Sequence, residues 1–472
     1  MPITLAVDFG STYTKLVAID AEGETLVGTA QSPTTVQEGI DVGLDRALEA
    51  LRSSCGVRRS DIARTFASSS AAGGLRMVAI GLVPDLTAEA ARRAALGAGA
   101  KVLRVCSYDL SQRDLAELAA LAPDMLLLCG GTDGGERRTI LRNAAALAGS
   151  TLRVPVVVAG NRAVQDEVEA TLRGAGVECV VVGNVLPELD RLDVEPARSA
   201  IRAIFMQRIT QAKGLDRARA FVGDIVMPTP MAVLEGARLL ASPEGGGLGE
   251  LLVVDVGGAT TDVHSVASGA PSSPGLVPRG LPEPHAKRTV EGDLGIRVNA
   301  ATILESVGAA RVAAALGAGA GEADMAAVAE RVRALAADVT RVPPDAAAHA
   351  LDAALAALAV DTALERHAGQ VSTAYTPTGA VQLLHGKDLS NVSMVIGTGG
   401  VFAHGRHPRR ILEAACRSER SPTSLRPRAP ALRVDSRYTL FAAGLLAPSA
   451  PRAAAAVAAR HLQPAEDDAH DV

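Results

Sequence analysis

The chain carries one short pattern twice, in the segments LAVDFGSTYTK (5–15) and VVDVGGATTD (253–262). Each segment is an apolar run that ends in an aspartate and continues into a turn of glycines and hydroxyl-bearing residues. Glycine permits a tight turn and lets the backbone approach a ligand closely. The pattern therefore predicts two β-hairpins, with Asp8 and Asp255 at the ends of their first strands. Two such hairpins facing each other would hold an anionic ligand between two lobes.

The residue types in both segments suit a magnesium-bound nucleotide. Mg²⁺ prefers oxygen ligands and keeps several waters, so one or two carboxylates plus phosphate oxygens are enough to hold it. We predict that Asp8 and Asp255 bind this metal or position the attacking water, which makes both of them catalytic candidates. Short hydroxyl donors and a lysine point charge suit phosphate oxygens. The predicted phosphate cradle consists of Gly10, Ser11, Thr12, Lys15, Gly257, Gly258, Thr260 and Thr261.

A third apolar run, VSMVIGTGGV (392–401), also ends in glycines. Close backbone approach there would suit an adenine or ribose, so Gly397, Gly399 and Gly400 are predicted nucleoside contacts. The same pattern also fits a plain strand–turn–helix, and that alternative stays open. The P-loop consensus G-x-x-x-x-G-K-[ST] does not occur in the chain.

An acid pair, Glu291 and Asp293, lies beside two glycines in TVEGDLG (289–295). A carboxylate there would position a water, or a metal-bound water, at the terminal phosphate. Glu291 is therefore a third catalytic candidate. A solvated turn explains the same residues equally well, and the sequence does not decide between the two.

Composition excludes several classes of protein. A formal net charge of −5 and a pI near 6.0 argue against a nucleic-acid partner. Five cysteines are scattered without a C-x-x-C motif, which favours a reducing cytoplasm. The first predicted strand begins at Ile3 and leaves no room for a signal peptide. No uninterrupted apolar stretch of about 20 residues occurs, so we expect no membrane-spanning helix.

At 472 residues the chain should form more than one domain. Strands and helices alternate over 84–185, which predicts an inserted parallel α/β domain. Its turn GGTDGG (130–135) is either an anion site or only a tight turn. The predicted organisation is a first lobe beginning at 1–83, the insert at 84–185, connecting helices at 186–247, a second lobe at 248–404, and a C-terminal helix returning to the first lobe, with a loose tail, at 405–472.

Together the three glycine-rich segments resemble the phosphate and adenosine loops of the actin/Hsp70/sugar-kinase ATPase superfamily. Within it the chain is similar to the MutL (glutamate mutase L) family, the accessory proteins of adenosylcobalamin-dependent mutases. Long segments carry this narrower resemblance: residues 68–102, LLLCGGTDGG (126–135), GDIVMPTPMAVLEGA (223–237) and KRTVEGDLGIRVN (287–299). The resemblance implies a two-lobed actin-like (ribonuclease H-like) α/β ATPase fold with ATP and Mg²⁺ as cofactors.

The same resemblance implies a function. The lobes would move on ATP hydrolysis and reactivate a glutamate mutase or related aminomutase as a chaperone, with mutase subunits as partners and a homodimer left open. The insert is the candidate partner-binding domain, because cobalamin domains are themselves α/β sheets; this is fold-level analogy. Two rivals stay open: a small-molecule kinase of the same fold, and an iron–sulfur ATPase activator of acyl-CoA dehydratases, which would need clustered cysteines.

Overall fold

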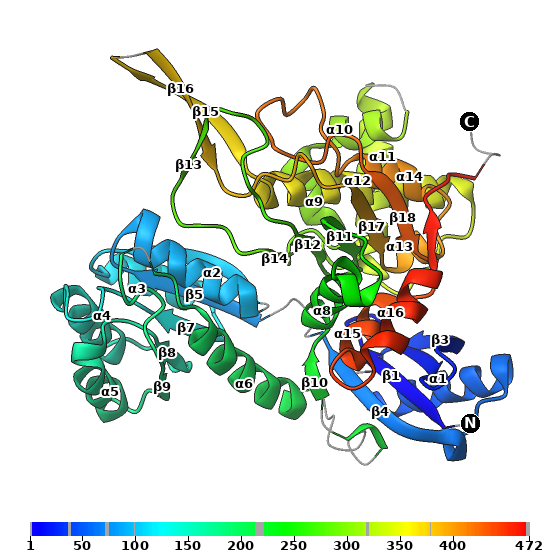
Figure 1. Cartoon of the computed structure of the whole chain (residues 1–472), viewed down its shortest axis with the longest axis horizontal. Helices are drawn as coiled ribbons and strands as arrows, with labels where there is room; N and C mark the ends of the chain where they lie inside the picture. The colour runs from blue at the N-terminus through cyan, green and yellow to red at the C-terminus, as the bar shows by residue number, and fades with distance from the viewer. Residues whose placement is uncertain are drawn as a thin grey trace. The chain divides into compact units, whose positions relative to one another are not determined.

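A computed structural model describes residues 2–35, 39–70, 75–98, 100–189, 191–212, 221–223, 225–317, 321–377 and 379–468 (Figure 1). Its internal contacts divide the chain into two compact units. Unit 1 comprises Met1–Gly73, Ile209–Arg279 and Glu283–Val472, and unit 2 comprises Gly74–Arg208 and Gly280–Pro282. Each unit is built around sheets of its own.

The first sheet of unit 1 has the strand order β10-β4-β1-β2-β3. Its strands are β1 (Ile3–Phe9), β2 (Tyr13–Asp20), β3 (Thr25–Pro33), β4 (Ile62–Ser69) and β10 (Ile225–Pro228), and helix α1 (Ile40–Cys55) packs beside β3. Strand β1 is antiparallel to β2 and parallel to β4. Every residue of β1 is buried, which explains its nearly continuous apolar sequence.

The second sheet of unit 1 repeats this arrangement, with the strand order β14-β12-β11-β17-β18-β19. Its strands are β11 (Leu251–Val256), β12 (Thr261–Val266), β14 (Ala286–Glu291), β17 (Met394–Thr398), β18 (Ala431–Asp435) and β19 (Leu462–Pro464). Strand β11 is antiparallel to β12 and parallel to β17. The sheet continues past 404, because β18 and β19 complete it. The repeated sequence pattern therefore becomes a repeated hairpin at the same place in two sheets.

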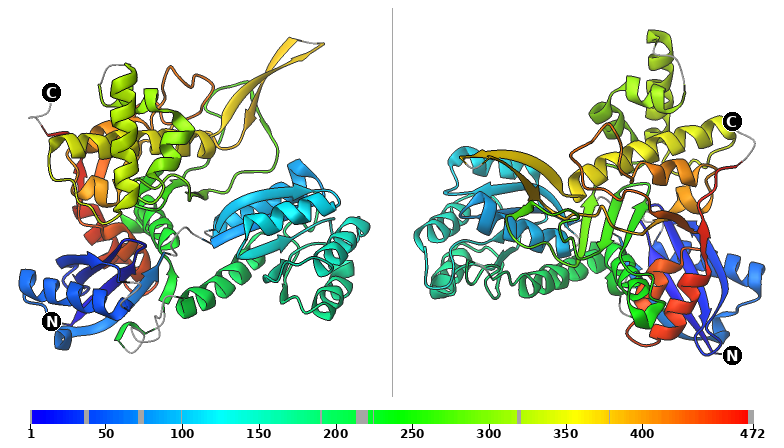
Figure 2. Two further views of the ribbon diagram at one scale, coloured as in Figure 1. Left: turned by 180° about the vertical axis from the view of Figure 1, so that it is seen from behind. Right: turned by 45° about the horizontal axis from the view of Figure 1, so that its top comes forward.

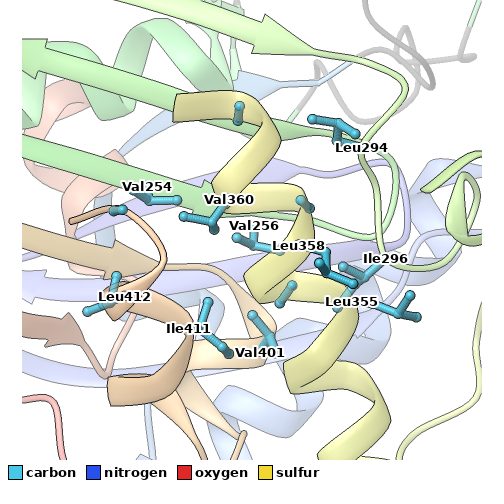
Figure 3. Close-up of a cluster of buried hydrophobic side chains, with 14 of the residues drawn as sticks. Val254, Val256, Leu294, Ile296, Leu355, Leu358, Val360, Val401, Ile411 and Leu412 are labelled. Carbon is cyan, nitrogen blue, oxygen red and sulfur yellow. The ribbon is translucent and has the colours of Figure 1, made fainter. Parts of the chain in front are cut away.

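Helix α12 (Ala346–His367) packs a row of buried apolar residues into the core over the second sheet. Figure 3 shows Leu355, Leu358 and Val360 of this helix beside Val254 and Val256 of β11. The helices around it are α9 (Ala300–Val307), α10 (Ala309–Ala315), α11 (Glu322–Ala337), α13 (Gly400–Ala403) and α14 (Pro408–Glu413). Among the described helices only α12 is long and apolar enough to cross a membrane, and it lies mostly inside this core.

Two helices join the lobes of unit 1: α8 (Thr229–Ala241) and α15 (Thr439–Leu446). They share one apolar cluster with Val17 of the first sheet and Val253 of the second. The helices cross with their backbones in contact. A Cβ at Gly444 would stand only 1.8 Å from the Ala232 carbonyl oxygen, so no larger residue fits there. Helix α16 (Pro451–Arg460) adds to this layer.

Unit 2 is a parallel sheet with the strand order β6-β5-β7-β8-β9. The strands are β5 (Leu75–Gly81), β6 (Ala100–Ser107), β7 (Met125–Leu128), β8 (Val156–Val158) and β9 (Cys179–Val181). The helices are α2 (Glu89–Ala98), α3 (Gln112–Leu121), α4 (Arg138–Ala148), α5 (Gln165–Gly174) and α6 (Glu195–Ala212), whose last residues, from Ile209, fall in unit 1. When these five strands are numbered by their order along the chain, the sheet has the strand order 2-1-3-4-5, as flavodoxin-like domains do.

The predicted limits of the insert, 84 and 185, fall inside unit 2. Strand β5 was assigned to the first lobe, but it lies between β6 and β7 in the parallel sheet. All but one of its residues are buried, as a strand covered on both faces requires. No local pattern marks this boundary, because a mostly apolar run of seven residues fits either sheet.

A third, small sheet in unit 1 has the order β13-β16-β15. It consists of β13 (Leu276–Arg279), β15 (Gln370–Thr376) and β16 (Gly379–His385). The hairpin of β15 and β16 extends away from the second-lobe helices (Figures 1 and 2). With two lobes of like topology and a separate parallel α/β unit, the predicted fold class is confirmed.

Candidate functional site

Asp8 lies near the end of β1 and is almost completely buried. The Ser68 hydroxyl donates to its Oδ1 atom over 3.1 Å, and the Thr229 hydroxyl donates to the same oxygen. These donors come from β4 and from the first residue of α8. Two hydroxyl donors on one oxygen fix the orientation of the carboxylate and leave its other oxygen, Oδ2, for a ligand.

Asp255 occupies the equivalent place in β11 of the second lobe. Burial raises the pKa of this carboxyl to about 6; nearby Lys15 lowers it, whereas Asp8 and Asp435 raise it further. A carboxyl with this raised pKa holds its proton only weakly near neutral pH. A cation that replaces the proton would stabilise the charged form of the buried carboxylate. Because the Asp8 charge contributes to this shift, the two predicted aspartates lie near each other.

The two glycine turns contact each other across the lobes. A Cβ at Gly258 would lie 3.0 Å from the Thr12 methyl group. Each turn is closed by a backbone hydrogen bond, from Gly10 to the Tyr13 carbonyl (3.1 Å) and from Gly257 to the Thr260 carbonyl (2.8 Å). Gly399, with φ of +108°, comes still closer: its Cβ would meet the Val256 carbonyl at 2.3 Å. Only glycine fits at this third loop, where the backbone passes Asp255.

A cavity of about 440 Å³ opens between these loops. That volume lies within the usual range of small-molecule sites. Of the predicted site residues, the cavity is lined by Thr12, Lys15, Asp255, Gly257, Gly258, Gly399 and Gly400. Its far wall comes from α12 and from the segment 339–343, to which Tyr13 donates a hydrogen bond at the Thr340 carbonyl (3.5 Å).

A buried ion pair stiffens this far wall. Arg297 donates to both carboxylate oxygens of Asp352, over 2.8 and 2.6 Å. The same guanidinium reaches the Arg341 carbonyl oxygen over 3.4 Å. A bidentate pair of this kind fixes orientation as well as distance. The wall segment is therefore tied to α12 and to the loop that follows the second turn.

Tyr438 is a wall residue that the sequence did not suggest. The Lys15 ammonium lies 4.4 Å from the centre of its ring, and the ring of His404 lies 5.7 Å away. The backbone of Tyr438 has φ of +55°, which is unusual for a residue with a side chain. Asp435 holds this strained turn, because its carboxylate accepts hydrogen bonds from the backbone and hydroxyl of Thr439. The strain places an aromatic face under the predicted phosphate-binding lysine.

Some predicted contacts do not face the cavity. Thr261 is completely buried and donates its hydroxyl to the Leu294 carbonyl oxygen (2.7 Å), so it cannot serve a phosphate as we expected. Gly397 is also buried, with its Cβ position 2.7 Å from the Phe402 ring. Gly10, Ser11 and Thr260 lie in the two turns but do not line the cavity wall. These residues therefore shape the two turns, and they do not present hydrogen-bond donors at the cavity wall.

Glu291 and Asp293 are both engaged by one arginine. Arg366, near the end of α12, donates to Glu291 over 2.5 Å and to both carboxylate oxygens of Asp293 over 3.0 Å. Neither acid lines the cavity. The ion pairs link the end of β14 and the turn that follows it to α12. A catalytic role for Glu291 therefore has no geometric support.

Sequence reasoning also passed over the groups that position the aspartates. Ser68 and Thr229 act on Asp8 from 60 and 221 residues away, and no local pattern marks them. Asp262 pairs directly opposite Asp255 on β12. Burial, followed by the nearby Asp255 charge, raises the pKa of Asp262 well above its usual range. These effects favour the neutral form of Asp262.

These residues fit a magnesium-bound nucleotide. The described residues hold no group of three or more His, Cys, Asp or Glu side chains suited to a metal. Two aspartates without further ligands match Mg²⁺, which completes its shell with water and phosphate oxygens. Glycine at 10, 258 and 399 lets the turns pack closely, because a Cβ at these positions would meet protein atoms at 3.0 Å or less, and Lys15 lines the cavity beside them. Asp8 and Asp255 would hold the ion, and the turns would enclose the phosphates.

Comparison with known proteins gives one close and several remote similarities. The family described as MutL protein matches residues 4–462. Protein MutL of Clostridium tetanomorphum is 46% identical over 465 residues, covering 98% of this chain and 99% of that protein. Nucleotide-free acetone carboxylase shows a TM-score of 0.38 at 13% identity, over 94% of this chain and 70% of that one. The ADPNP-bound activator of 2-hydroxyisocaproyl-CoA dehydratase from Clostridium difficile shows 0.31 at 10% identity, over 97% and 94%.

Proposed function

The chain belongs to the MutL family, and on that premise we propose that it is a Mg-ATP-dependent ATPase that reactivates an adenosylcobalamin-dependent mutase. One observation supports this proposal above all others. Asp255, Lys15 and residues of all three glycine turns line one cavity, and Asp8, from the topologically equivalent sheet, lies close enough for its charge to raise the pKa of Asp255. That donor set suits a metal-bound polyphosphate and little else.

In this proposal each part of the site has a separate task. Bound Mg²⁺ would neutralise phosphate charge and orient the terminal phosphate for attack. Asp255, partly buried beside Lys15, orients the attacking water through its carboxylate oxygens. Asp8, fixed by Ser68 and Thr229, keeps the metal end of the site in place. Because the two aspartates belong to different lobes, a change at the terminal phosphate alters the fit between the lobes.

The partner in this proposal is a mutase, glutamate mutase or a related aminomutase, and the candidate contact is unit 2. Its loops at the carboxyl ends of β7, β8 and β9 are held rigidly from inside. Asn161 accepts from the Gly134 backbone and donates to the Gly135 and Glu136 carbonyls, and Asn184 donates to Asp133. Open α/β sheets bind their ligands at this edge. A preformed edge outside the nucleotide site suits a cytoplasmic partner protein.

The first test is nucleotide binding. Titration calorimetry of the purified protein with Mg-ATP and Mg-ADP should show one site per chain, and steady-state assays should show slow basal hydrolysis. The reason is that Asp255, Lys15 and the glycine turns line one cavity. Protein without affinity for either nucleotide in the presence of Mg²⁺ would overturn the proposed function as a whole.

A small-molecule kinase of the same fold is the alternative, and the same protein tests it. A kinase would phosphorylate a metabolite at ordinary enzyme rates, about 1–10³ per second. We expect a metabolite screen for ADP release to stay at the basal rate. An iron–sulfur activator is less well supported, because Cys106, Cys129 and Cys179 are buried singly and all five cysteines are free.

The affinity for Mg-nucleotide should depend on pH through Asp255. Its pKa of about 6 in the fold exceeds its ordinary value of 3.8, so the folded protein holds this proton more tightly than the unfolded chain does. A cation at Asp255 must displace the proton. We therefore expect affinity to be level above about pH 7 and to fall through pH 6 to a lower plateau, with a total loss of less than about tenfold. Calorimetry from pH 5 to 8 measures this, and an Asp255→Asn variant should remove the dependence; an identical profile in the variant would assign the proton elsewhere.

A further inference from the structure

The hairpin of β15 and β16 differs from the rest of the chain in composition. Residues 370–386 contain no Asp, Glu, Lys or Arg, whereas charged residues make up 21% of the whole sequence. Tyr375, near its tip, is 87% exposed. Only the base of the hairpin is packed, where Leu384 and Val371 meet Leu276 and Leu425. A protruding, uncharged strand pair is unusual, because exposed edges normally carry charges that prevent further pairing.

The outer edge of β15 has hydrogen-bonding groups that point away from β16. Along a strand, the backbone groups of alternate residues point to the same side. The Val371 amide points outward, since it donates to the Thr423 carbonyl oxygen over 2.9 Å. The amides and carbonyls of Thr373 and Tyr375 must therefore point outward as well. The described part of the chain supplies no backbone partner for either residue.

The opposite edge of the same small sheet is protected. It is formed by β13, which contains Pro278 and the charged Arg279. Proline lacks the amide that a further strand would need, and a charge on an edge disfavours pairing. The edge of β15 has neither device over 372–376. Only one side of this sheet is therefore open to addition of a strand.

We propose that this edge pairs with β15 of a second copy of the chain, as an antiparallel, two-fold symmetric interface. With Thr373 and Tyr375 both pointing outward, a self-pair places Thr373 opposite Tyr375 of the second copy, and Ala374 opposite itself on the axis. The two outward pairs would exchange four backbone hydrogen bonds. Tyr375 would cover the β-branched Thr373 across the strands, which is a favourable cross-strand pair. An uncharged strand meets its own copy without like-charge repulsion, and the small Ala374 suits the close contact on the axis.

Cysteine cross-linking tests the register directly. Residues directly opposite each other in a non-hydrogen-bonded pair have Cα atoms about 4.5 Å apart, which lies within the range that a disulfide spans. The variant Ala374→Cys should form a covalent dimer under mild oxidation, at least about tenfold faster than the matched control Thr373→Cys, whose partner is residue 375. The unchanged protein controls for its own cysteines, of which Cys55 and Cys416 are half-buried. Equal rates for the two variants would overturn the proposed pairing.

A charge exchange gives an independent measurement by analytical ultracentrifugation. Thr373→Lys combined with Tyr375→Lys places like charges opposite each other and should yield monomer. Thr373→Lys combined with Tyr375→Glu places Lys opposite Glu in the same register and should restore the dimer at low salt. If the unchanged protein is a monomer at all accessible concentrations, or if both double variants behave alike, the inference is wrong. Neither outcome depends on nucleotide binding, so this test is separate from that of the proposed function.

Discussion

Asp255→Asn should reduce ATP turnover by on the order of 10²- to 10⁴-fold, while Mg-nucleotide affinity at pH 7.5 changes by less than about tenfold. The glycine turns and Lys15 that enclose the phosphates remain, but the carboxylate that orients water is lost. Single-turnover hydrolysis and calorimetry on the same preparation separate the two effects. Equal losses in binding and turnover would mean that Asp255 has a structural role.

The same variant should be more stable than the unchanged protein when no nucleotide is bound. The pKa of Asp255 is raised from 3.8 to about 6. The folded state therefore loses stability from this group as pH rises from about 4 through 6, and the loss is complete above that range. Removing the carboxyl should raise the free energy of unfolding at pH 7.5 by about 1–3 kcal/mol. Asp45→Asn on the exposed face of α1 is the control, with an expected change within about 0.5 kcal/mol.

Deleting unit 2 should abolish ATP-dependent rescue of an inactivated cobalamin mutase and leave nucleotide binding largely intact. Every residue that lines the nucleotide cavity belongs to unit 1. The cut should join 73 to 209 through a short Gly/Ser linker. Cutting at 84 and 185 instead would leave β5 in the protein without the strands on either side of it. Calorimetry with Mg-ADP and a mutase reactivation assay give the two readouts.

An experiment with isolated unit 2 complements the deletion variant. It has its own apolar core, built from Val78, Leu126 and Val156 among others, so residues 74–208 should fold in isolation and compete with the full chain for the mutase. Rescue by the deletion variant would place the contact on the ATPase lobes. Loss of nucleotide affinity in that variant would mean that unit 2 supports the site, and the 130–135 turn would then become a candidate ligand loop.

The sequence by itself determined the parts of this protein that depend on local physics. A strand that ends in Asp, Gly and a hydroxyl residue can form only a few turns, so both hairpins, with Asp8 and Asp255 near the ends of their first strands, were predictable from short segments. The same holds for strand–helix alternation, because a buried parallel strand has a continuous apolar sequence. These patterns fixed the fold class before any contact was known.

Only the tertiary structure decided which side chains act on those aspartates. Ser68 and Thr229 reach Asp8 because β1, β4 and α8 meet in space, and nothing near residue 8 signals it. Thr261 and Glu291 looked like ligands in their local patterns, yet a carbonyl at Leu294 and a guanidinium at Arg366 bind them instead. Strand β5 could have joined either sheet. Hydrogen-bond partners and burial are set by long-range packing, and a linear sequence records them only through the fold it specifies.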